Sequence, residues 1–199
     1  MVRALIAGQK TQTRRILKAA VPEPPAIDNL AHEAKHPWPY LDAYCSQPPT
    51  QENPRGMGPL WAWWTRDNRP CEQFKVGYIP GQKLWVRETF AHVSNFPPTV
   101  RYYATDDVHE ARRKRPAIHM PRWASRLTLA ITNVRVQRLN EISEADAEAE
   151  GVDALSMADI PRQATWNRRH DFANLWDMIH GHGAWAANPY VVAVTFTVA

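Results

Sequence analysis

The sequence of 199 residues contains no run of eighteen apolar residues, the length that a membrane-spanning helix needs. It also lacks an apolar stretch near its N-terminus of the kind that secretory signal peptides carry. It has only two cysteines, Cys45 and Cys71, and both lie in a proline-rich stretch. A disulfide between them is not required, because two cysteines in an intracellular chain are more often free thiols. We therefore expect a cytoplasmic protein without a membrane partner.

Several sequence motifs that identify common enzyme classes are also missing. There is no Gly-x-Gly-x-x-Gly, no Walker loop and no Gly-x-Ser-x-Gly, so a dinucleotide fold, a P-loop and a hydrolase elbow lack support. The histidines are scattered; His180 and His182 are close together, but no cysteine or carboxylate cluster accompanies them. We therefore expect neither a metal site nor a cofactor.

The length and charge of the chain are informative in a broader way. A chain of 199 residues suits one domain with a real core, here residues 1–199, that carries a large insertion. The net charge of +4 permits an anionic partner such as RNA or a nucleotide without identifying one. Nine tryptophans are present; a tryptophan can fill a core, stack on a base or anchor an interface, and core filling is the commonest of these.

Residues 22–80 differ in composition from the rest of the chain. Eleven of the 17 prolines lie there, and pairs such as Pro24-Pro25 and Pro48-Pro49 exclude long helices. Large apolar side chains persist in the same stretch, among them Trp61, Trp63 and Phe74. The pattern predicts a long irregular insertion that packs onto the domain, and loops of this length are often functional.

Outside the insertion, the pattern predicts short helices and strands. Gly8 ends a first helix, Pro80-Gly81 suits a type II turn, and the alternation of apolar residues slips by one near Asn133, which indicates a bulge. The predicted elements are a helix over 3–7, an extended segment over 11–15, strands over 83–90, 100–104, 126–139 and 192–198, and helices over 143–150 and up to Gly181. This order predicts an α+β domain built around a small antiparallel β-barrel.

Two of these helices have clear end signals. Ser143 with Asp146 three residues later is a variant of the capping box, and Gly151 ends that helix. The second helix places Phe172, Leu175, Trp176 and Ile179 at the spacing of one apolar face.

The stretch 7–15, Ala-Gly-Gln-Lys-Thr-Gln-Thr-Arg-Arg, carries the most chemistry in the fewest residues. Lys10 beside threonine hydroxyls can be a base beside a nucleophile, or part of a loop that binds phosphate. In an extended segment Thr11 and Thr13 face the same way. Glu150 ends a helix, where the helix dipole disfavours a carboxylate. It is either a solvated surface residue or a partner of Lys10 or an arginine across a pocket.

A basic run at residues 112–115 leads into a proline-flanked loop over 116–126. In this loop Trp123 lies between Arg122 and Arg126, and cations interleaved with a flat side chain suit a phosphate and a base. The alternative is an ordinary solvated basic face.

Five blocks of this sequence together resemble the ASCH-domain family of the PUA-like superfamily, in the variety found in phage and prophage genomes. They are spread over most of the chain outside the insertion and lie at residues 7–15, 80–88 (Pro-Gly-Gln-Lys-Leu-Trp-Val-Arg-Glu), 120–126 (Met-Pro-Arg-Trp-Ala-Ser-Arg), 142–151 and 185–191 (Trp-Ala-Ala-Asn-Pro-Tyr-Val). The resemblance implies a small β-barrel with flanking helices and a cleft suited to RNA or a nucleotide.

Some members of this family are amidohydrolases that remove the acyl group from N4-acetylcytidine with a lysine, a threonine and a glutamate. Matched block by block, these catalytic residues fall on Lys10, Thr13 and Glu150. Other members are thought to bind RNA or to cleave it. The chain departs from the small amidohydrolases in its insertion over 22–80.

The resulting expectation is an amidohydrolase that acts on an N4-acylated cytosine nucleoside. Thr13 would attack the amide carbonyl, while Lys10 would act either as a neutral base or as a charged stabiliser beside Glu150. The alternatives are a module that binds RNA or a nucleotide without chemistry, and a metal-independent ribonuclease. Under all three hypotheses the partner is a modified nucleoside or single-stranded RNA. The expected substrate-binding residues are Thr11, Arg14, Arg87, Glu88, Arg122, Trp123 and Arg126.

Overall fold

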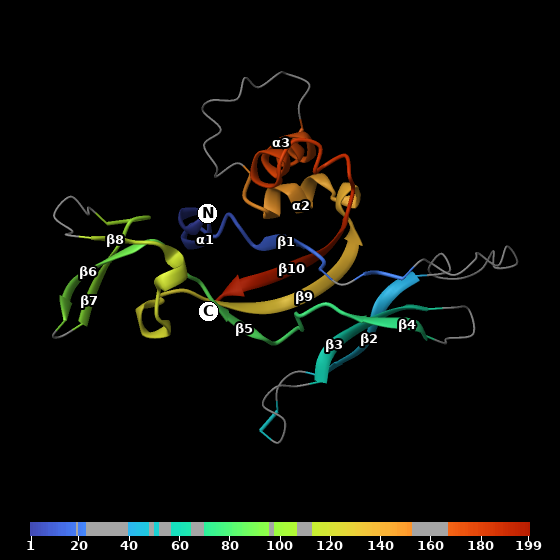
Figure 1. Ribbon diagram of the computed structural model, residues 1–199, viewed down its shortest axis with the longest axis horizontal. Coiled ribbons are helices and arrows are strands. Elements are labelled where there is room, and N and C mark those ends of the chain that lie inside the picture. Colours follow the sequence, from blue (N-terminus) through green and yellow to red (C-terminus); the bar gives the residue numbers. More distant parts are fainter. Residues whose placement is uncertain are drawn as a thin grey trace, which may run out of the picture.

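The computed structural model describes residues 1–18, 20–22, 40–47, 50–51, 57–64, 70–95, 98–106, 113–152 and 167–199. This part of the chain has a mixed α+β fold with a curled antiparallel sheet and three α-helices (Figure 1). The helices are α1 (Val2–Ile6), α2 (Glu144–Ala149) and α3 (Arg168–His180). The strands are β1 (Gln12–Ile16), β2 (Tyr40–Gln47), β3 (Met57–Trp64), β4 (Pro70–Lys75), β5 (Lys83–Trp85), β6 (Phe90–Asn95), β7 (Pro98–Tyr102), β8 (Lys114–Arg115), β9 (Thr128–Arg138) and β10 (Tyr190–Val198).

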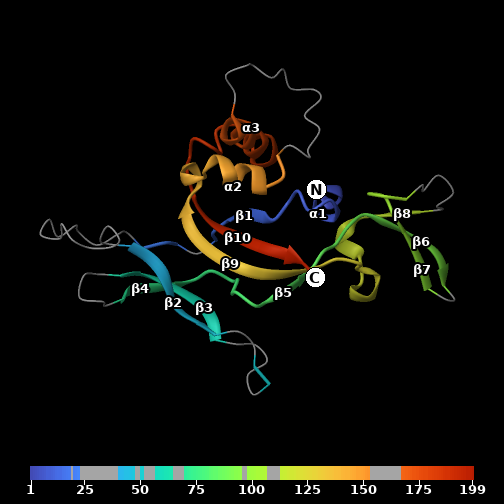
Figure 2. The same ribbon diagram turned by 180° about the vertical axis from the view of Figure 1, so that it is seen from behind.

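The central sheet has the strand order β1-β10-β9-β5, and all its pairs are antiparallel. The long strands β9 and β10 curl strongly, so that the sheet forms half of a barrel (Figures 1 and 2). The run Val191–Val194 in β10 is completely buried because both faces of this strand are covered. Val192 and Val194 pack in the main core, whereas Val191 packs on the opposite side with Phe172 and Trp176.

A bulge interrupts the pairing of β9 with β10 at the predicted place. Thr195 pairs with Asn133, but the next residue, Phe196, pairs with Ile131, so that Thr132 has no partner opposite. An extra residue of this kind bends the strand and increases its twist. The slip in the apolar pattern of the sequence therefore marks one of the positions at which the sheet curls.

Helices α2 and α3 lie together over one face of the curled sheet in both views (Figures 1 and 2). Helix α2 begins as predicted, because Ser143 Oγ accepts a hydrogen bond from the Asp146 N–H at 3.1 Å. Helix α3 begins at Asn167, whose side chain accepts from the His170 N–H, and ends at Gly181. The predicted apolar face is only partly buried, since Ile179 is 63% exposed.

The prediction of an irregular insertion is wrong for the described part of residues 22–80. Strands β2, β3 and β4 form a second antiparallel sheet, and Trp61 and Phe74 of that sheet join the main core. The prolines exclude helices but are accommodated at strand starts and irregularities. Pro70 begins β4, and Pro59 lies within β3 where its pairing with β2 is irregular, beyond the stretch that pairs with β4. Cys71 in β4 is a free thiol.

The third sheet has the order β7-β6-β8 and lies at the other end of the long axis from β2–β4 (Figures 1 and 2). The strand expected over 83–90 is shorter than predicted: β5 ends at Trp85, and Ser125 Oγ then donates a hydrogen bond to the Val86 carbonyl at 2.8 Å. The strand expected over 100–104 is β7, which begins two residues earlier. None of the helices in the described ranges is long and apolar enough to cross a membrane.

Candidate active site

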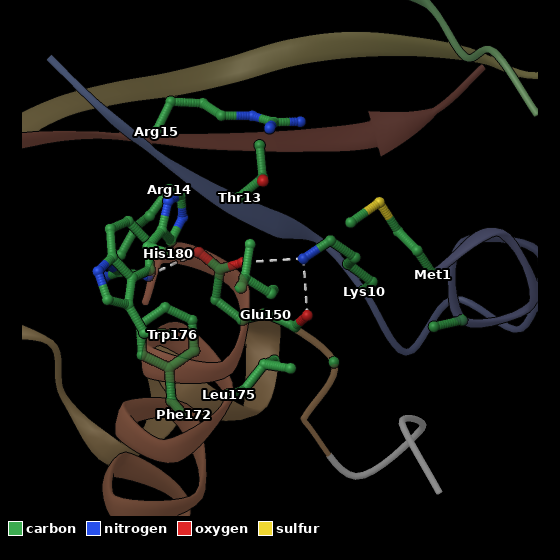
Figure 3. A pocket seen from close by; sticks show the side chains of 13 residues that line it. Met1, Lys10, Thr13, Arg14, Arg15, Glu150, Phe172, Leu175, Trp176 and His180 are labelled. Carbon is green, nitrogen blue, oxygen red and sulfur yellow. Dashed lines mark hydrogen bonds and ion pairs between the residues drawn. The ribbon is translucent and has the colours of Figure 1, made fainter. Parts of the chain in front are cut away.

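A cavity of about 200 Å³ lies between β1, the end of α2 and helix α3 (Figure 3). Lys10, Thr13 and Glu150 all line it. Lys10 and Glu150 are 140 residues apart in the sequence and are hydrogen-bonded to each other, so the fold brings the three residues of the family resemblance to one place.

Backbone contacts hold Lys10 in position. Gly8 has a φ of +70°, and the Gln9 and Lys10 N–H groups both donate to the Ala4 carbonyl, at 2.9 and 3.1 Å. These bonds turn the chain sharply after α1. The Thr11 N–H then donates to the Ala149 carbonyl at 2.9 Å, which fixes the start of β1 against the end of α2.

Lys10 and Glu150 form a buried ion pair. Lys10 Nζ donates to Glu150 Oε2 at 2.8 Å and to the backbone carbonyl of the same residue at 2.7 Å. Only 7% of Lys10 and 5% of Glu150 are exposed. An ammonium group has three N–H donors, and the two bonds to Glu150 leave one donor for a ligand in the cavity. Glu150 is therefore not a solvated surface residue. It is the partner of Lys10 across a pocket, which was the other interpretation offered by the sequence.

Arg14 holds the other oxygen of Glu150. Its guanidinium donates to Glu150 Oε1 at 3.2 Å and to Asp146 Oδ2 at 2.8 Å, and its side chain has no exposed surface. Arg135 donates to both oxygens of Asp146. Burial raises the pKa of Asp146, but the hydrogen bonds from Arg135 and the charge of Arg14 outweigh it and hold the pKa below its ordinary value. Arg14 therefore supports Glu150 from behind, and its expected role in direct substrate binding is not favoured by this geometry.

Gly151 is needed where α2 ends beside Lys10. Its φ of +78° is a conformation that L side chains rarely adopt, and a Cβ at this position would lie 3.1 Å from Lys10 Cβ. The glycine lets Glu150 approach the lysine closely. The helix-ending glycine that the sequence predicts is thus also a contact residue of the site.

Strand β1 presents alternate residues to different surroundings. Gln12 and Arg14 are buried, whereas Thr13 is partly exposed and Arg15 is exposed. Thr13 and Arg15 both line the cavity, and Figure 3 shows them above the Lys10–Glu150 pair. No hydrogen bond joins Lys10 Nζ to Thr13 Oγ, both of which the structure describes. Thr11 is exposed and does not line the cavity, so this predicted substrate-binding residue lies outside it.

Helix α3 forms an apolar and partly aromatic wall of the cavity. Phe172 and Trp176 lie with ring centres 5.8 Å apart, and the Trp176 ring lies 4.2 Å from the His180 ring at an interplanar angle of 35°. Leu175 and Ile179 also face the cavity from this helix. From the sequence, this face was predicted only as the apolar side of a helix. The aromatic spacing of four residues from Phe172 to Trp176 to His180 is the signal that could have identified a flat wall.

The other predicted substrate-binding residues lie elsewhere. Arg126 donates to both oxygens of Glu88, at 2.8 and 2.9 Å, and Glu88 is 4% exposed, so these two form a structural ion pair. Arg87 and Arg122 both lie over the Trp85 ring, and Trp123 is 55% exposed. None of these residues lines the cavity, so the structure does not bring them together with Lys10 and Thr13.

Comparisons with protein-family models, curated proteins and solved structures find no match for this chain. Within the described residues, no group of three or more His, Cys, Asp or Glu side chains is placed to hold a metal ion. The polar side chains that line the cavity are those of Lys10, Thr13, Arg14, Arg15, Glu150 and His180. Lys10 has one spare donor, and Glu150 is held by both Lys10 and Arg14.

Proposed function

We propose that the chain is an ASCH-type amidohydrolase with a PUA-like barrel, and that it removes the acyl group from an N4-acylated cytosine nucleoside. The observation that carries this proposal is the 2.8 Å ion pair between Lys10 and Glu150 in a cavity that Thr13 also lines. An amine, an acid and an alcohol in one cavity are the groups that acyl transfer uses.

The ion pair favours the mechanism in which Lys10 stays charged. Thr13 Oγ adds to the amide carbonyl carbon, and the spare N–H of Lys10 stabilises the oxyanion that develops on the carbonyl oxygen. Glu150 accepts the hydroxyl proton and returns it to the departing N4 nitrogen. Water then hydrolyses the acyl ester on Thr13. Arg14 keeps Glu150 in place throughout, because it binds the oxygen that Lys10 does not.

The wall formed by α3 supports binding of a flat heterocycle. Phe172 and Trp176 are each only 4% exposed, so a base would contact mainly the exposed Ile179 and His180 side chains of this wall. Phe172 and Trp176 are buried at the cavity, and their positions are fixed by the core of α2 and α3. In the proposed complex the cytosine ring packs against this wall, and its acylated N4 faces Lys10 and Thr13.

Incubation of the purified protein with N4-acetylcytidine tests the proposal. We expect release of cytidine, and a loss of at least about a hundredfold in kcat for Lys10→Ala and for Thr13→Ala, since general acid–base and oxyanion groups each contribute that much. Lys83→Ala is a matched control, because Lys83 is an exposed lysine on β5 outside the cavity. Absence of cytidine release, or release that both site variants leave undiminished, would rule the proposal out.

A second candidate function, RNA binding without chemistry, has one observation in its favour. Trp123 is exposed and lies beside Arg122 in a region that also contains the exposed basic residues 113–115. Such a surface suits the bases and phosphates of single-stranded RNA. Under this alternative, RNA binding weakens steeply with salt and Trp123→Ala reduces it, while N4-acetylcytidine is not hydrolysed.

A further inference from the structure

A second hollow, of about 700 Å³, opens next to the cavity. It lies between the end of β1 and the segment after β4, and Ile16, Leu17, Val76 and Val192 supply its apolar surface. This volume lies within the range of small-molecule binding sites, which is about 300–1,000 Å³. We call this hollow the basic groove, because Arg15, Lys18 and Lys75 lie at its rim.

Three cations border the basic groove: Arg15 and Lys18 from β1 and the residues after it, and Lys75 from the end of β4. All three are exposed, and no acidic residue lines the groove among the residues that the structure describes. None of the three forms an ion pair with a described residue. Lys10 and Arg14 differ from them, because Glu150 and Asp146 neutralise both. The groove therefore concentrates positive charge that no described carboxylate balances, and it attracts an anion.

Arg15 connects the groove to the catalytic cavity, because it lines both. Its side chain lines the cavity together with that of Thr13 (Figure 3). A ligand whose reactive group meets Thr13 and which extends past this residue therefore enters the basic groove. The cavity itself, at about 200 Å³, is smaller than most sites for whole ligands, so it suits the acylated base while the remainder of the substrate lies outside.

We propose that the substrate is a phosphate ester of the acylated nucleoside, with the acylated base in the cavity and the phosphate in the basic groove on Arg15, Lys18 and Lys75. This inference rests on the proposed amidohydrolase function. A guanidinium and two ammonium groups are the side chains that bind phosphate oxygens. A free nucleotide and a nucleotide within an RNA strand present the same chemistry to such a groove.

The experiment compares kcat/KM for three substrates: N4-acetylcytidine, its 5′-monophosphate, and a three-nucleotide RNA with N4-acetylcytidine in the middle. We expect kcat/KM for the better of the two phosphorylated substrates to be about tenfold higher than for the nucleoside at low salt. This difference should shrink as salt screens the exposed cations. Lys18→Ala and Lys75→Ala should each reduce this preference by about threefold. Lys83→Ala, the exposed lysine outside the groove, should leave the preference as it is.

The outcomes separate the phosphate source and the two proposals. Preference for the monophosphate identifies a free nucleotide, and preference for the trinucleotide identifies an RNA strand. The proposal that the basic groove binds the phosphate is wrong if kcat/KM is equal for all three substrates, or if both lysine variants keep the full preference. A separate measurement compares the affinities of the protein for cytidine 5′-monophosphate and for cytidine, followed by tryptophan fluorescence. If the monophosphate binds more tightly but no substrate is hydrolysed, the amidohydrolase proposal is wrong and the groove is supported as a phosphate site. If the two ligands bind equally, the phosphate-site proposal is wrong.

Discussion

Replacing Glu150 with glutamine tests whether the buried charges of the site depend on one another. The carboxylate is 5% exposed and holds Lys10 through one oxygen and Arg14 through the other. The substitution keeps the shape of the side chain but removes its negative charge. Lys10 then has no described carboxylate partner, while Arg14 keeps Asp146. One buried cation is left without its counter-charge.

The size of the effect follows from the burial of the pair. Removal of one partner from a buried ion pair costs about 3–5 kcal/mol, because the remaining charge stays desolvated. The backbone carbonyl of residue 150 still accepts a hydrogen bond from Lys10, so we expect a value near the lower end, about 3 kcal/mol. Lys10→Met in the Glu150→Gln background removes the orphaned charge as well, and it should recover more than half of the loss.

The assay is denaturant unfolding followed by tryptophan fluorescence, with the free energy of unfolding extrapolated to water. Glu148→Gln is the matched control, because Glu148 lies on the same helix but is exposed, and we expect a change within about 0.5 kcal/mol. A free energy of unfolding for Glu150→Gln that equals that of the control would show that the ion pair contributes no net stability. The electrostatic account of the site would then be wrong.

Three further predictions concern neighbours of this pair. Gly151→Ala should lower the free energy of unfolding by at least about 1–2 kcal/mol in the same assay, because φ is +78° and the new Cβ would crowd Lys10; an unchanged value would contradict the contact. The lowered pKa of Asp146 contributes stability that is present above about pH 4, the ordinary pKa of an aspartate, and is lost as the pH falls through the lower folded pKa. Unfolding curves between pH 2 and about pH 6 should therefore show a shallower pH dependence for Asp146→Asn, and an identical slope would refute this. His180→Ala should weaken binding of cytidine about tenfold by equilibrium titration if the base packs on α3, and unchanged binding would exclude that wall.

Local signals in the sequence predicted much of the fold outside the insertion. Gly8 acts through its own backbone conformation and Ser143 through its own side chain, and the bulge opposite Thr195 leaves a slip in the apolar pattern. All three features can therefore be predicted without knowledge of the fold. Strands β2–β4 were missed because prolines are frequent in this stretch. Whether a strand accommodates a proline depends on its pairing with other strands, which is non-local. The expected barrel is, in the described residues, an open curled sheet of four strands.

The candidate site was predictable only in part. Nothing in the local sequence pairs Lys10 with Glu150, because their contact depends on how the chain folds between two residues that are 140 positions apart; the family resemblance supplied that pairing. Arg14 was predicted to bind substrate; it lines the cavity, but its guanidinium is engaged by Glu150 and Asp146, while the alternation of β1 leaves Arg15 exposed at the cavity and the groove. Glu88 and Arg126 were predicted to bind substrate and are found in an ion pair with each other, a pairing that the sequence alone does not reveal.

The most direct test of the account is to look for the acyl group on Thr13 itself. The protein is mixed with N4-acetylcytidine, quenched rapidly and digested, and the peptide that contains Thr13 is examined by mass spectrometry. We predict that a fraction of this peptide carries one acetyl group, and that Thr13→Ala carries none and no longer releases cytidine. Release of cytidine by Thr13→Ala at the rate of the unmodified chain, with no acetyl group on that peptide in either protein, would contradict the claim that Lys10, Thr13 and Glu150 form a catalytic site.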